Sequence, residues 1–108
     1  MKIPLDPALI ATLEQGPDQG GQGDVWRDII NNLPMAHDVM AAAVARRHLG
    51  IHRYGRPLAS TEGTRDADVD LAQELLDAAG YAWRAGRVGI ARRMLLELDQ
   101  LFIDWNQP

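Results

Sequence analysis

Four carboxylates with helical spacing are the residues of this chain best suited to chemistry. Asp66, Asp70, Glu74 and Asp77 stand three or four positions apart, so on an α-helix they share one face within an arc of roughly 80°. No Lys or Arg joins this acidic row before Arg84. Adjacent carboxylates repel each other, and a bound cation removes that cost. The row therefore predicts a site for Mg²⁺, with Mn²⁺ as a second possible ion. The alternative is a solvated face whose acids stand favourably near a helix N-terminus.

A cluster of cationic side chains is the second candidate. It consists of Arg46, Arg47, Arg53 and Arg56, with Tyr54 among them. Arg forks match phosphate oxygens, and a Tyr ring can stack on a base, so the cluster suggests nucleotide binding. Tyr81, next to the acidic row, is a further aromatic candidate. The alternative is that the Arg side chains neutralise the acidic helix within the fold.

The elements that must position these residues are predicted to be helices. Val and Ile recur at helical spacing, and no segment alternates convincingly as a strand would. Capping residues, Pro and Gly mark the boundaries: Asp6 and Asp24 are expected to cap helix starts, and the acidic helix is expected to begin near residues 64–66. The expected helices are a short one ending near residue 15, and others at 25–32, 34–49, about 66–85 and 88–105. This is an all-α chain, a small bundle of about four to five helices.

The chain is expected to divide into an N-terminal helical extension, residues 1–33 with a Gly-rich loop at 16–23, and a helical-bundle domain, residues 34–108. The last helix has a heptad-like seam suited to packing on another helix. The seam comprises Val88, Ala91, Leu95, Leu98, Phe102 and Trp105. Because several apolar stripes look too wide for a small monomer, a homodimer or homotetramer is expected.

Composition narrows the function classes. The 108 residues carry a net charge of −4, which argues against binding duplex nucleic acid. With no cysteine, disulfides and thiolate metal sites are excluded. No apolar run approaches the roughly 20 residues that span a bilayer, and Met1–Asp6 has no hydrophobic signal core. A cytoplasmic protein that does not enter membranes is expected.

Three features of residues 34–86 form a pattern: the Arg-Tyr-Gly turn at 53–55, the Arg-Asp-Ala stretch at 65–67, and the helix in which Asp70, Glu74 and Asp77 precede Tyr81. In these features the segment resembles small bacterial and phage proteins related to the MazG-like, all-α nucleoside triphosphate pyrophosphohydrolases. The resemblance implies Mg²⁺ held by helix carboxylates, and cleavage of a nucleoside triphosphate between its α- and β-phosphates.

Carried over by position, Glu74 and Asp77 match the family's Glu-x-x-Asp ligand pair, and Asp70 matches the acid one turn earlier. Glu74 and Asp77 would also act in catalysis. Arg46, Arg47, Arg53, Tyr54 and Tyr81 would contact the nucleotide. The family's Glu-Glu-x-x-Glu run on the preceding helix is missing, because Asp38 is the only acid between Met35 and His48. The alternative function is therefore a non-catalytic nucleotide-binding or protein-interaction module with an incomplete metal site.

Overall fold

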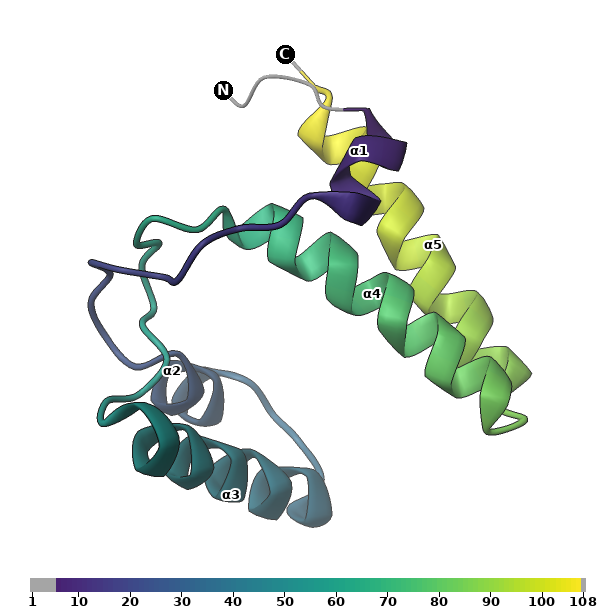
Figure 1. Cartoon of the computed structure of the whole chain (residues 1–108). Helices are drawn as coiled ribbons and strands as arrows, with labels where there is room; N and C mark the ends of the chain where they lie inside the picture. The colour runs from purple at the N-terminus through teal and green to yellow at the C-terminus, as the bar shows by residue number, and fades with distance from the viewer. Residues whose placement is uncertain (1–5, 108) are drawn as a thin grey trace. The chain divides into compact units, whose positions relative to one another are not determined.

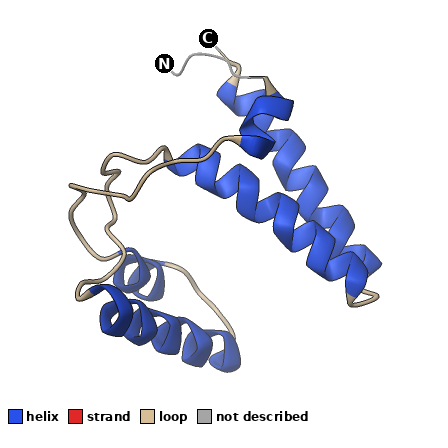
Figure 2. Cartoon of the chain, in the orientation of Figure 1, coloured by secondary structure: helices blue, strands red, loops and turns tan. Residues whose placement is uncertain are grey.

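The structure, a computed structural model, describes residues 6–107, in which there are five helices and no strand (Figures 1 and 2). The helices are α1 Pro7–Thr12, α2 Val25–Asn32, α3 His37–Tyr54, α4 Ala67–Arg84 and α5 Val88–Trp105. This confirms the predicted all-α class. Most of the N-terminal segment on which the absence of a signal core was argued, residues 1–5, lies outside the described residues. Among those described, no helix combines the length and hydropathy needed to cross a membrane.

The chain forms two compact units. Unit 1 joins the N-terminal residues up to Gln15 with everything from Asp66 onward, and therefore contains α1, α4 and α5. Unit 2 is the intervening segment Gly16–Arg65 and contains α2 and α3.

Unit 1 is an antiparallel hairpin of α4 and α5, with α1 packed across the end where α4 begins and α5 finishes (Figure 1). Much of the interior between the long helices is alanine, since Ala72, Ala79, Ala82 and Ala91 are all buried. The larger buried side chains gather at the α1 end of the hairpin. They are Ile10, Val69, Leu98 and Trp105. Small interior residues let two helices approach closely, so many larger apolar side chains of the hairpin remain outside its core.

Side-chain amides fasten α1 to α4. Gln73 Nε2 donates to the carbonyl oxygens of Ile10 at 2.9 Å and Leu13 at 2.6 Å. The Ile10 carbonyl also accepts from the Leu13 N–H at 3.4 Å, so Gln73 adds a second donor to it and supplies one to the Leu13 carbonyl, which lies just past the end of α1. At the other end of α1, Asp6 caps the helix by accepting from the Ala8 N–H, as Asp-Pro at a helix start predicts.

Unit 2 packs α2 against α3, beside two loops that run together over residues 16–24 and 55–65. The Val25 N–H donates to Leu58 O at 2.8 Å, and the Thr61 N–H donates to Gln22 O at 3.0 Å. Gly63 allows the closest approach, because a β-carbon there would lie 2.0 Å from the Gln19 carbonyl oxygen. The Gly-rich segment is therefore hydrogen-bonded to a second loop.

Helix α3 is longer than predicted, because it continues through Gly50 to Tyr54 instead of ending near Leu49. A glycine inside a helix costs only about 1 kcal/mol, which the flanking turns can outweigh. The helix stops at Gly55, which takes the left-handed conformation with φ 76° and donates its N–H to Ile51 O. Gly readily adopts this conformation, whereas other residues are strained in it.

The predicted seam of α5 is only partly buried. Ala91, Leu98 and Trp105 face the interior of unit 1, whereas Val88 and Leu95 are about half exposed. The heptad-like spacing identified the apolar positions of α5. It did not distinguish those that are buried inside unit 1 from those that lie on its surface.

Candidate functional site

The acidic row begins with a residue that has a structural task. Asp66 is the N-cap of α4, and its Oδ1 accepts from the backbone N–H groups of Asp68 at 2.9 Å and Val69 at 3.3 Å. An acid at this position accepts from N–H groups that have no partner within the helix. Its negative charge is also stabilised by the positive end of the helix dipole.

Asp70, predicted to bind metal, is half-buried and hydrogen-bonded to Gln15. The Gln15 Nε2 donates to Asp70 Oδ1 at 2.9 Å and to Asp66 O at 3.1 Å. The Gln15 Oε1 accepts from the Asp66 N–H at 2.6 Å. The Gln15 side-chain amide therefore links the segment after α1 to the first turn of α4, and Asp70 is one of its hydrogen-bond acceptors.

Further along α4, the remaining predicted site residues face solvent. Glu74 and Asp77 are exposed, and the Tyr81 side chain is 70% exposed. Their spacing of three and four places them on one helix face. Within residues 6–107, no three His, Asp or Glu side chains are grouped so that they could hold a metal ion. Glu74 and Asp77 thus offer two adjacent carboxylates on the surface of unit 1.

The predicted nucleotide-contacting Arg residues belong to unit 2, where one of them is in an ion pair. Arg47 Nε donates to Asp24 Oδ2 at 2.8 Å, joining α3 to the N-cap residue of α2. Partial burial alone would raise the pKa of Asp24. The Arg27 N–H and the Arg47 guanidinium outweigh burial, so the pKa of Asp24 lies below its ordinary value. Arg47 therefore neutralises an acid of its own unit.

The other members of the Arg cluster are exposed on unit 2. Arg46 and Arg53 lie on α3, Arg56 follows it, and the Tyr54 ring at the end of the helix is 78% exposed. The acidic row and the Arg cluster thus belong to different units of the chain. Each is presented on its own unit.

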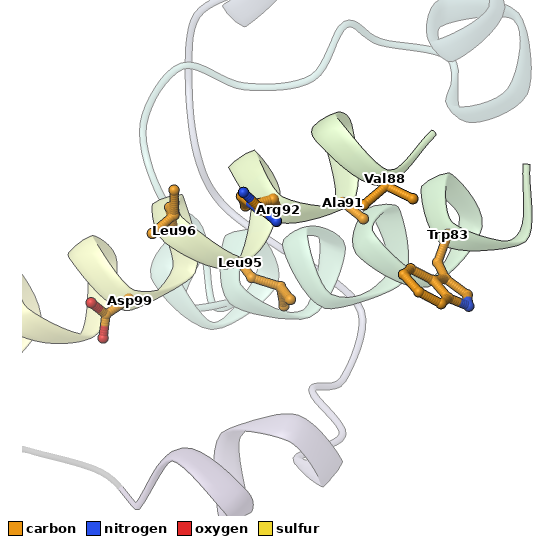
Figure 3. A pocket seen from close by; sticks show the side chains of 7 residues that line it. All are labelled: Trp83, Val88, Ala91, Arg92, Leu95, Leu96 and Asp99. Atoms are coloured by element: carbon orange, nitrogen blue, oxygen red, sulfur yellow. The ribbon is translucent and has the colours of Figure 1, made fainter. Parts of the chain in front are cut away.

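An open apolar groove of about 380 Å³ lies along the α4–α5 hairpin of unit 1 (Figure 3). Its lining residues are Trp83 from α4 and Val88, Ala91, Arg92, Leu95, Leu96 and Asp99 from α5. Of the three tryptophans in the chain, Trp105 is buried and Trp26 half-buried, but Trp83 is 68% exposed. A large exposed ring beside exposed leucines is typical of a surface that another apolar side chain covers.

Comparison of the chain with protein-family models, with curated proteins and with solved structures gives no significant match. The resemblance of residues 34–86 to the MazG-like pyrophosphohydrolases therefore stays a prediction.

Three polar residues make contacts between distant segments that the sequence did not indicate. Gln15 bonds to Asp66, 51 positions away, and Gln73 bonds to Ile10, 63 positions away. Local spacing in the sequence does not reveal contacts over such separations. Asp24 was expected as a helix cap, and it is one. Its pairing with Arg47 depends on how α2 packs on α3, which follows from tertiary structure rather than from either segment alone.

Proposed function

We propose that the chain is a non-catalytic helical module that binds another protein through the apolar side of its α4–α5 hairpin. The observation that carries this proposal is the groove beside Trp83, Leu95 and Leu96, whose side chains are 68%, 51% and 61% exposed. Single exposed leucines are common on protein surfaces, but a contiguous apolar patch that includes a Trp is typical of interaction sites.

The shape and lining of the groove favour a helix as the bound element. Long grooves along two packed helices accept an amphipathic helix whose side chains recur every three or four residues. Trp83 would supply the large apolar contact at one end. Arg92 and Asp99, which also line the groove, would orient the partner through charge.

Site-specific photo-crosslinking tests this proposal. A photoreactive amino acid replaces Leu96 in the groove, and a control places it at Glu97, which is exposed on the other side of the same helix. We expect a defined protein adduct from position 96, in an extract of the native cells, that is absent from position 97. Equal or no labelling at the two positions would contradict an interaction surface in the groove.

A second candidate function is binding, and cleavage, of a nucleoside triphosphate with Mg²⁺ in the cytoplasm. The specific observation that favours it is that Glu74 and Asp77 are both exposed on one face of α4, with the exposed Tyr81 ring one turn further on. Mg²⁺ is often held by only one or two carboxylates, together with waters and substrate phosphates, so this pair has a suitable donor set. The ion would offset phosphate charge, and Tyr81 would stack on the base.

Binding measurements test the nucleotide proposal. Calorimetric titration with Mg²⁺ and a panel of nucleoside triphosphates, alongside a pyrophosphate assay, is repeated for Glu74→Gln/Asp77→Asn and for Glu97→Gln as the control. We expect Mg²⁺-dependent nucleotide binding to be weakened at least about tenfold in the double variant alone. Binding that is absent from the unmodified protein, or unchanged in the double variant, would refute a site at these carboxylates.

A further inference from the structure

One face of α5 carries a pattern that reads the same from either end. We call the α5 face the six residues Val88, Arg92, Leu95, Leu96, Asp99 and Ile103. Their spacings are four, three, one, three and four, and at about 100° per residue they fall within an arc of roughly 100°. All six are exposed, and five of them line the groove. This face is separate from the one that Ala91, Leu98 and Trp105 bury inside unit 1.

The chemistry of the α5 face is also matched about its centre. When the helix is turned end for end about the point between Leu95 and Leu96, Val88 takes the place of Ile103. Arg92 takes the place of Asp99, and Leu95 that of Leu96. Apolar residues therefore exchange with apolar residues, and the cation exchanges with the anion. A twofold interface requires a surface with this self-complementarity.

From this pattern we propose that α5 pairs with α5 of a second copy of this chain, antiparallel, about a twofold axis between Leu95 and Leu96. The proposal deepens the proposed function by naming the partner, and it rests on the groove being an interaction surface. Leucines from the two copies cover one another at the centre. Arg92 of each copy faces Asp99 of the other, and Val88 faces Ile103 at both ends.

Charge decides between this arrangement and a parallel one. In a parallel pair about a twofold axis, Arg92 would face Arg92 and Asp99 would face Asp99, so both contacts would repel. In the antiparallel pair both contacts attract. Within one helix the two residues are seven positions, or about 10 Å, apart along the axis, so they do not satisfy each other directly. Opposite charges across an interface fix its register and orientation.

Charge reversal at exposed residues tests the proposal. It is preferred to the removal of apolar side chains, because their removal also disturbs folding. Sedimentation equilibrium gives the dimer dissociation constants of the unmodified chain, of Arg92→Asp and of Asp99→Arg. We expect a dimer for the unmodified chain, and a dissociation constant raised at least about tenfold in each variant, because both contacts then repel. An equimolar mixture of the two variants should form a heterodimer, since all four side chains then meet opposite charges.

Disulfide trapping reports the register directly, because the natural chain has no cysteine. We expect Val88→Cys mixed with Ile103→Cys to give a crosslinked heterodimer. Val88→Cys alone should give none, because in the proposed pair two copies of position 88 lie about 22 Å apart along the helix axis. Crosslinking of Val88→Cys to itself would overturn the antiparallel register.

The outcomes separate this inference from the function on which it rests. A monomer at every concentration tested would overturn self-association, and so would a mixture of the two charge variants that stays monomeric. If position 96 then crosslinks to a different protein, the interaction module survives and the partner named here is wrong. If position 96 labels nothing above its control, both proposals fail.

Discussion

The Asp24–Arg47 ion pair is the contact through which acid should weaken unit 2. Asp24 caps α2 with its Oδ1 and binds Arg47 of α3 with its Oδ2, so one carboxylate serves a helix terminus and a helix–helix contact. The pKa of Asp24 is lowered in the folded chain. The charged Asp24 side chain therefore stabilises the fold at pH values above the ordinary Asp pKa of about 4. This contribution is lost as the pH falls through the lowered pKa that Asp24 has in the folded chain.

The first prediction uses neighbouring arginines to isolate that contribution. Arg47→Ala should lower the thermal unfolding midpoint at pH 6, and the difference from the unmodified chain should shrink as the pH falls through the lowered pKa of Asp24. Arg46→Ala removes an exposed arginine of the same helix and should have little effect across this pH range. Circular dichroism melts of the three proteins measure this. A deficit for Arg47→Ala that does not shrink as the pH falls below 6 would show that the ion pair is not its source.

At the residue level, the sequence revealed roles that depend on local chain geometry. Asp6, Asp24 and Asp66 were each placed at a helix start, and each caps a helix, because a cap needs only the following two or three residues. The pairings of Asp70 with Gln15 and of Arg47 with Asp24 involve distant segments. The residue types alone did not reveal that Asp70 accepts from Gln15 or that Arg47 pairs with Asp24.

At the level of elements, α3 has one glycine inside it and one at its end, with opposite effects on stability. Gly50 lies inside the helix, and nothing lies within 4 Å of a β-carbon placed on it. Gly55 ends the helix at φ 76°, also with open space around a β-carbon. Since neither site is crowded, a substitution to alanine reports on backbone conformation alone.

The second prediction follows from this matched pair. Gly50→Ala should raise the free energy of unfolding by about 0.5–1 kcal/mol, because alanine loses less conformational freedom in a helix. Gly55→Ala should lower it by about 1 kcal/mol, because the left-handed conformation strains a side chain. Urea unfolding of both variants gives the two signs. Shifts in the same direction would mean that the helix does not end at Gly55 as described.

The lengths of the elements show why sequence prediction succeeded for some helices and not for α3. The bounds of α2 and α5 agree with those expected, since a cap or a tight turn marks their ends. Gly50 does not end α3, because the cost of one interior glycine is small beside that of ending a helix whose next four residues still form it.

Across the whole molecule, apolar burial is unequal. Unit 1 buries Ile10, Val69, Leu98 and Trp105, whereas Ala43 is the one buried residue in residues 16–65. Large buried side chains contribute about 1.5–3 kcal/mol each, and a buried alanine contributes much less. Unit 2 therefore depends more on its hydrogen bonds and on the ion pair.

The third prediction is that the two units lose structure separately. In hydrogen–deuterium exchange followed by mass spectrometry, peptides from α4 and α5 should stay protected longer than those from α2 and α3, because regions with few buried apolar contacts open more easily. Trp105→Ala should speed exchange in α4 and α5 with little change in α3. Equal protection throughout would indicate one cooperative unit instead.

The return of the chain at the boundary between the units has a consequence for engineering. Gln15 already holds the Asp66 N–H, and the Arg65 guanidinium donates to Gly16 O at 3.0 Å, so the chain leaves unit 1 and rejoins it at almost the same point. Residues 16–65 are thus an insertion with adjacent ends. A short glycine bridge could replace all fifty without stretching the backbone, leaving a three-helix miniature protein that retains the α5 face.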